Sequence, residues 1–151
     1  EKANEVKTDL TDFDVIVETD LEKLVKESRL IITTTSSKEP LIQSDWVRAG
    51  THITAVGSDT PEKCELDPNI LNRADLVVAD SLEQNLIRGE IHQAIKRSLI
   101  DSDNIVELGE IFAGLKPGRI KKDSITIADL TGVAVQDLVI AESVFKAYSA
   151  T

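Results

Sequence analysis

Two short segments of this 151-residue sequence carry side chains whose types and spacing could serve chemistry. Residues 33–37 are a run of hydroxyl side chains that can hydrogen-bond a ribose or a phosphate, although threonine also suits the end of a β-strand. Residues 57–63 place an acid and a base on one tight loop. There, Asp59 can act as a general acid/base and Lys63 can contact an anion, unless Asp59 only stabilises the turn through its own backbone. The residue types alone leave both alternatives open.

The remaining candidate residues carry weaker signals. His52 and His92 have no Cys, Asp or Glu at metal-ligand spacing, so we interpret both as structural histidines and expect no metal site. Cys64 follows Lys63, which can lower the pKa of a thiol, but no histidine or second cysteine accompanies it, and we expect an inert thiol. Asp137 falls among apolar residues of a predicted C-terminal helix, where it is either buried and paired or placed to favour the positive helix N-terminus.

The hydrophobic periodicity predicts the elements that must position these residues. Short apolar runs alternate with amphipathic stretches about four times, which is typical of a parallel sheet with crossover helices. The predicted strands are residues 15–17, 30–35, 52–56, 76–79 and 125–130, and the predicted helices are 21–28, 44–50, a segment from 67, 81–99, 105–114 and 132–148. Ligands bind beyond the carboxyl ends of the strands in such sheets, which selects four loops, residues 33–37, 56–63, 80–81 and 130–132.

Two of the predicted helices have distinctive sequences. Ser81 and Gln84 predict a capping box at the start of the long helix 81–99. The last helix, residues 132–148, is apolar over most of its circumference. We therefore expect that helix to pack against a partner subunit or another domain.

The composition disfavours several classes of protein. Seventeen Lys and Arg against 27 Asp and Glu give a net charge of −10, which repels nucleic acids and anionic membrane surfaces. The single cysteine excludes an internal disulfide, and no apolar run approaches the roughly 18 residues that span a bilayer. The protein is therefore expected in the reducing cytoplasm, without nucleic-acid or membrane partners.

Familiar nucleotide and hydrolase motifs are missing from the sequence. The seven glycines never form a G-x-G pair, so the dinucleotide fingerprint is not found, and neither is a P-loop or a G-x-S-x-G motif. Considered alone, the residues predict an α/β domain of the nucleotide-binding type and do not identify its reaction.

Several segments, in order along the chain, resemble a known family. The sequences TTTSSKEP (33–40), HITAVGSDTPEK (52–63) and DLTGVAVQD (129–137) resemble three signatures of the ornithine cyclodeaminase/mu-crystallin family. Further segments that are similar in kind and order are GEI (89–91), ELGE (107–110) and KPGR (116–119).

The resemblance implies an NAD- or NADP-dependent protein, usually a homodimer, that acts on a small amino or imino acid. Residues 1–128 would then form a truncated Rossmann-type domain, and residues 129–151 a strand end and a helix that return to a dimerisation and substrate domain. The leading activity is ornithine cyclodeaminase-like: an amino acid is oxidised to an imine, cyclises with loss of ammonia and receives the hydride back. The alternatives are alanine dehydrogenase, ketimine reductase and a non-catalytic mu-crystallin-like binding protein.

The resemblance also assigns roles to single residues. Asp59 matches the proton donor/acceptor of the family, and Thr131 matches a position that touches substrate. The cofactor contacts fall on Thr35, Ile53, Thr54, Ala55, Val56, Lys63 and Leu130.

The sequence departs from the family pattern in three ways. Glu62 stands where the family usually has Gly, and Leu130 stands where some members have Ser. The Gly-rich loop, two strands of the sheet and the Lys and Arg that bind the substrate carboxylate would lie upstream of Glu1. The chain therefore resembles the C-terminal half of a family member, and we expect it to be inactive alone.

Overall fold

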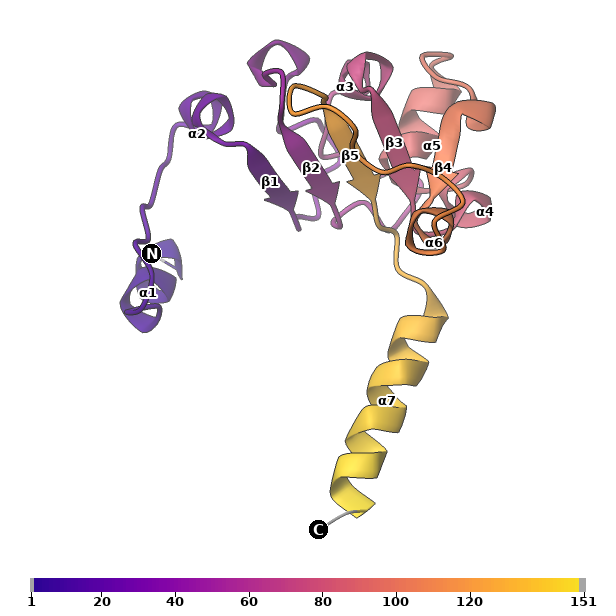
Figure 1. The fold of residues 1–151 in the computed structure, drawn as a ribbon. Helices are drawn as coiled ribbons and strands as arrows, with labels where there is room; N and C mark the ends of the chain where they lie inside the picture. The colour runs from indigo at the N-terminus through magenta and orange to yellow at the C-terminus, as the bar shows by residue number, and fades with distance from the viewer. Residues whose placement is uncertain (1, 150–151) are drawn as a thin grey trace.

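Five parallel strands form the sheet on which the predicted loops are mounted (Figure 1). The structure is a computed structural model that describes residues 2–149. The strands lie in the order β1-β2-β5-β3-β4. Their bounds are Leu30–Thr33 for β1, His52–Ala55 for β2, Leu76–Ala79 for β3, Ile105–Glu107 for β4 and Thr126–Asp129 for β5. The predicted α/β fold with a parallel sheet is confirmed.

The last strand of the sequence lies in the middle of the sheet. In β5, Thr126 is paired with His52 of β2 on one side and with Leu76 of β3 on the other. Because every pairing is parallel, the carboxyl ends of β1, β2, β3 and β5 meet at one edge. All four predicted ligand loops therefore begin at the same edge of the sheet.

Seven α-helices and two 3₁₀ turns connect or flank the strands in the described part of the chain. The helices are α1 (Lys2–Asp9), α2 (Leu21–Glu27), α3 (Asn69–Arg73), α4 (Leu82–Asn85), α5 (Gly89–Lys96), α6 (Leu108–Phe112) and α7 (Ala134–Ser149), and the turns are Ser44–Trp46 and Ser102–Asn104. No helix within residues 2–149 combines the length and apolar character needed to span a membrane.

The predicted long helix 81–99 is wrong, because the chain breaks it at Gly89. This glycine has a φ of +90°, and a Cβ at this position would come within 2.6 Å of a carboxylate oxygen of Asp129. The result is two helices, α4 and α5, separated by a turn at residues 86–88. The Ser81 side chain makes no capping bond, and the Leu82 N–H donates instead to Oε1 of Glu107 at 2.8 Å.

Three other predicted elements differ from the structure. Residues 15–17 form no strand, and Ile16 is 77% exposed without a neighbouring strand to pair with. Residues 44–50 form only the short 3₁₀ turn. The predicted helix 105–114 begins as strand β4, where Ile105 pairs with Val77, and becomes helical at Leu108, where Glu107 and Glu110 form the capping box.

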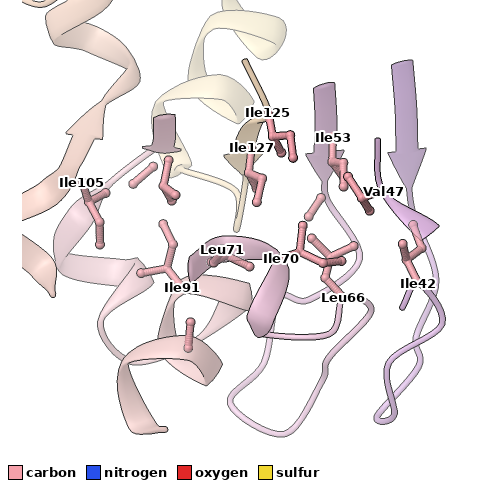
Figure 2. Packing of buried hydrophobic residues seen from close by; sticks show 14 of the residues in the cluster. Ile42, Val47, Ile53, Leu66, Ile70, Leu71, Ile91, Ile105, Ile125 and Ile127 are labelled. Atoms are coloured by element: carbon pink, nitrogen blue, oxygen red, sulfur yellow. The ribbon is translucent and has the colours of Figure 1, made fainter. Parts of the chain in front are cut away.

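The hydrophobic core lies between the sheet and the helices that cover one of its faces. Figure 2 shows Ile53 of β2 and Ile127 of β5 packed near Ile70 and Leu71 of α3 and Ile91 of α5. All five of these side chains are buried. The core therefore fixes α3 and α5 against the strands whose ends carry the predicted site.

The last helix stands away from the sheet (Figure 1). No residue of α7 is buried, and Asp137 lies exposed in its first turn. The exposed apolar side chains of α7 include Val135, Leu138, Val139, Ile140, Val144 and Phe145. Nothing in residues 2–133 covers them, so the packing of α7 against another subunit or domain, and the division at residue 128, stay predictions.

Truncation of Ile127 tests the assignment of the core. Ile127→Ala removes a fully buried side chain from the central strand and should lower the free energy of unfolding by about 2–5 kcal/mol. Ile120→Ala is the matched control, because Ile120 is 79% exposed and its truncation should change stability by no more than about 0.5 kcal/mol. Urea unfolding followed by circular dichroism measures both. Equal midpoints for the two variants would contradict this core.

Candidate functional site

Three of the predicted loops meet at the carboxyl edge of the sheet. Thr35 follows β1, residues 56–63 follow β2, and Leu130 and Thr131 follow β5. Backbone hydrogen bonds join neighbouring chains where the strands end: Val56 N–H donates to the Thr33 carbonyl at 2.9 Å, and Leu130 N–H donates to the Ala55 carbonyl at 2.8 Å. The topology therefore brings the predicted cofactor, proton-transfer and substrate residues into one region.

Asp59 and Lys63 form an ion pair within the loop that follows β2. The Lys63 ammonium donates to Oδ1 of Asp59 at 2.5 Å, and the Asp59 side chain is 54% exposed. The hydrogen bond from Lys63 lowers the pKa of Asp59 below its ordinary value, so the carboxylate is ionised at neutral pH. An exposed, ionised carboxylate at this edge can accept a proton from a bound ligand.

The side chains of the predicted cofactor residues differ in their exposure to solvent. Thr35 and Val56 are exposed at the edge, and Leu130 is partly buried. Ile53 and Ala55 point into the core with 0% and 1% exposure, so their side chains support the strand from inside.

The hydroxyl groups of two predicted ligand contacts, Thr54 in β2 and Thr131 after β5, both have hydrogen-bond partners within the protein. Thr54 lies on the opposite face of the sheet from the core, where its hydroxyl lies 3.2 Å from Nε2 of His52. Thr131, the predicted substrate contact, is buried, and its hydroxyl donates to Oδ1 of Asp80 at 3.3 Å. Asp80 also accepts from the Gly132 N–H at 2.8 Å, so this carboxylate holds the loop after β5.

Buried carboxylates shape the site from beneath. Glu65 has no exposed surface, and its two oxygens accept from the backbone N–H groups of Thr35, at 2.5 Å, and Gly57, at 3.0 Å. A Cβ at Gly57 would overlap the Thr35 carbonyl oxygen and the Glu65 carboxylate. The loops after β1 and β2 therefore pack so closely that only glycine fits at position 57.

Glu90, on the first turn of α5, is a second fully buried carboxylate. It accepts from the Ser58 hydroxyl, from the Glu65 N–H at 2.7 Å and from the Leu66 N–H at 3.2 Å. Burial raises the pKa of Glu90, while these three hydrogen bonds act in the opposite direction.

Asp129 ends β5 and is 1% exposed. Its Oδ2 accepts from the Ile91 N–H at 2.8 Å, at the N-terminus of α5. Burial raises the pKa of Asp129 well above its ordinary value, and the nearby Glu90 and Asp80 carboxylates raise it further.

The sequence patterns do not single out Glu65, because charged residues are normally expected at the surface. Asp80 lies in one of the four selected loops and Glu90 in the segment GEI, but the sequence assigns neither of them a role. A signal was present for Glu90, which shares a helical face with Gln93 and Ala94 and is followed by Ile91, all of them buried. A carboxylate on the apolar face of a helix needs hydrogen-bond donors nearby, and here the donors belong to the candidate site.

The weaker candidates have structural partners. His52 Nδ1 lies 2.7 Å from the Thr126 hydroxyl, and burial lowers the His52 pKa. His92 Nδ1 lies 2.9 Å from the Leu86 carbonyl oxygen. Burial raises the pKa of the Cys64 thiol to about 12, the opposite of what a reactive thiol requires. Within the described residues, no group of three or more His, Cys, Asp and Glu side chains is arranged to hold a metal ion.

Comparisons with known proteins give a consistent result. The model of the ornithine cyclodeaminase/mu-crystallin family matches residues 1–151. The cyclodeaminase y4tK of Sinorhizobium fredii, itself uncharacterized, is 45% identical over 135 residues, which is 89% of this chain and 41% of that protein. The chain spans about two fifths of the length of such curated relatives.

Two solved structures are similar to this chain in fold as well as in sequence. The iminosuccinate reductase of Paracoccus denitrificans in complex with NAD⁺ has a TM-score of 0.79 and 42% identity over 86% of this chain and 39% of that one. An archaeal alanine dehydrogenase dimer with bound NAD has a TM-score of 0.86 and 36% identity over 95% of this chain and 45% of that one.

The buried Asp129 predicts an unusual dependence of stability on pH. Because its pKa is raised, the folded state binds more protons than the unfolded state between the ordinary carboxyl pKa, near ~4, and the folded value. The free energy of unfolding should therefore decrease as the pH rises through that window. Asp129→Asn still accepts from the Ile91 N–H but cannot ionise, so it should flatten this decrease. Urea midpoints at about pH 5 and about pH 8 measure the slope. An unchanged slope in the variant would show that Asp129 does not carry the proton.

Proposed function

The chain belongs to the ornithine cyclodeaminase/mu-crystallin family, and from this premise we propose that the protein containing it is an NAD(P)-dependent enzyme of amino-acid metabolism. Its reaction moves a hydride between the cofactor and a carbon that bears an amine or an imine. The observation that carries the proposal is the ionised Asp59 carboxylate, which lies with Lys63 at the edge where the loops after β1, β2 and β5 meet.

The residues at this edge suit the cofactor that the family implies. The Thr35 hydroxyl and the Lys63 ammonium offer polar contacts, and Val56 and Leu130 offer apolar surface for a flat ring. A groove of about 310 Å³ beside β1 is lined mostly by apolar residues of α2 and β1; of the proposed cofactor contacts it includes Thr35 and lacks Val56, Lys63 and Leu130. We propose that Thr35, Val56, Lys63 and Leu130 hold NAD(P), which supplies the hydride acceptor or donor when bound.

In this proposal, Asp59 moves the proton that accompanies the oxidation of an amine. Its carboxylate accepts a proton from the substrate nitrogen, or from a water that attacks the imine carbon, and returns it in the reverse step. The ion pair with Lys63 stabilises the charged form of Asp59 and holds its side chain within the loop. The Thr131 hydroxyl gives its hydrogen to Asp80, so its oxygen can accept from the ammonium group of an amino acid.

We propose a cyclodeaminase-like reaction first, because the 45% identical relative bears that name. Oxidation or reduction without cyclisation is the second candidate, supported by the likeness to alanine dehydrogenase and iminosuccinate reductase. The two reactions differ in how much NADH they form for each ammonia released. Cyclodeamination returns the hydride and releases ammonia with no net NADH, whereas an oxidative deamination forms one NADH for each ammonia. Parallel assays of ammonia and of NADH absorbance with ornithine and with alanine separate them.

We also propose that the protein is a homodimer, as the related archaeal alanine dehydrogenase is. The exposed apolar surface of α7 supports this proposal, because a helix that is apolar on so much of its circumference is normally covered. The cytoplasm remains the proposed compartment.

Replacement of Asp59 tests its role in proton transfer. In the protein that contains this chain, Asp59→Asn should lower kcat by about 10²- to 10⁴-fold. Affinity for NAD and the melting temperature should stay nearly unchanged, because Asp59 is more than half exposed and the amide oxygen of the replacement can still accept from Lys63. Glu62→Gln is the control, since Glu62 is an exposed acid of the same loop. Turnover by Asp59→Asn equal to that of Glu62→Gln would reduce Asp59 to a residue of the turn and would favour the binding-protein alternative.

A second prediction concerns residues 1–151 alone. This sequence has no G-x-G turn, which at a helix N-terminus usually binds the pyrophosphate of a dinucleotide. We therefore expect weak binding of NADH, without saturation at about 1 mM. Titration followed by NADH fluorescence measures it, and tight saturable binding would contradict the expectation.

A further inference from the structure

The loop that carries Asp59 and Lys63, residues 57–66, donates hydrogen bonds to buried carboxylates from both of its ends. Its first residues, Gly57 and Ser58, donate to Glu65 and Glu90. Its last residues return to the same place, because the N–H groups of Glu65 and Leu66 donate to Glu90 at 2.7 and 3.2 Å. Both ends of the loop therefore contact the same side chain of α5, Glu90.

Both oxygens of each carboxylate accept hydrogen bonds from other groups of the chain. Oε1 of Glu90 accepts from the Ser58 hydroxyl and the Glu65 N–H, while Oε2 accepts from the Leu66 N–H and, at 3.7 Å, from the Cys64 thiol. Oε1 of Glu65 accepts from the Thr35 N–H, and Oε2 accepts from the Gly57 N–H. A glutamine at either position must turn an NH₂ group toward an N–H donor, so one backbone group loses its partner in a buried place.

The same helix also holds the middle of the loop. Gln93, one turn after Glu90, donates from Nε2 to the Pro61 carbonyl at 2.8 Å and lies 3.4 Å from the Lys63 carbonyl. Asp59 itself makes no hydrogen bond to α5 among the described contacts, and its side chain is free to face a ligand. The position of Asp59 is therefore determined by its neighbours in the loop.

We propose that Glu90 and Glu65 are positioning residues, which together hold the Asp59–Lys63 pair and the Thr35 backbone in one arrangement at the ligand edge. The chain of contacts runs from α5 through Glu90 to the loop after β2, and from Glu65 to the loop after β1. This inference rests on the proposed function only for its effect on turnover, since the effect on the loop is independent of any reaction.

Glu90→Gln in the protein that contains this chain is the main test. Amide hydrogen exchange over residues 57–66 should accelerate by at least about tenfold, because the loop then opens without global unfolding. Cys64, whose Sγ lies 3.7 Å from Oε2 of Glu90, should react faster with a thiol reagent. The value of kcat should fall by about 10- to 100-fold through misplacement of Asp59, with a smaller change in KM for the cofactor.

Glu83→Gln is the matched control, because Glu83 is an exposed glutamate on the neighbouring helix α4 and should change none of these readouts. Ser58→Ala is a milder second variant if Glu90→Gln does not fold, since it removes a single donor to Glu90. It should also accelerate exchange at the start of the loop and lower kcat.

The outcomes separate the two proposals. Faster exchange and thiol labelling in Glu90→Gln, in a protein where Asp59→Asn has normal turnover, would support the positioning role and overturn the proposed function. Unchanged exchange and labelling in the folded Glu90→Gln and Ser58→Ala variants would overturn the positioning role. A lower melting temperature with normal kcat and normal loop exchange would likewise reduce Glu90 to a structural residue.

Discussion

The arrangement of the ligand edge depends on the burial of Glu90. A carboxylate without exposed surface is costly unless donors surround it, and the penalty amounts to several kcal/mol when they are lacking. The donors to Glu90 within residues 2–149 are the Ser58 hydroxyl, the backbone N–H groups of Glu65 and Leu66, and the Cys64 thiol. The loop can satisfy this carboxylate in few conformations. Because the loop must supply the hydrogen bonds of Glu90, these bonds also restrict where the loop places Asp59. They connect the buried face of α5 to the exposed loop at the edge of the sheet.

A second constraint acts one strand away, where α5 begins against the end of β5. Gly89 has a positive φ and lies so close to the Asp129 carboxylate that a side chain would collide with it. The break at Gly89 turns α5 so that the Ile91 N–H meets Asp129, while Glu90 points toward the loop after β2. Asp129 immediately precedes the loop that bears Leu130 and Thr131. One helix N-terminus therefore organises the loops after both β2 and β5.

Local sequence patterns were sufficient for four of the five strands, because the apolar runs ending at Thr33, Ala55, Ala79 and Asp129 are β-branched or alanine-rich and follow polar turns. They could not supply the break at Gly89, which arises from contact with a residue 40 positions later, nor the strand character of Ile105, which depends on pairing with Val77. The position of Asp59 on a loop after a strand could be predicted from the sequence, but its role in proton transfer rests on the family resemblance. Periodicity treats a charged residue as exposed and says nothing about donors from another loop, so it could not supply the contacts of Glu65 and Glu90.

The carboxylates near this edge fall into two kinds, one exposed and the other buried. Asp59 is exposed, paired with Lys63 and ionised, and it can exchange a proton with whatever ligand approaches. Glu65 and Glu90 are buried, and their hydrogen bonds to the loops do not depend on a ligand. On the proposed function, these residues would supply proton transfer beside a cofactor, a step that amine oxidation and imine reduction share. On the same proposal, a change of substrate-recognition groups outside this set of contacts would leave the position of Asp59 undisturbed, because Glu65 and Glu90 hold the loops independently of any ligand.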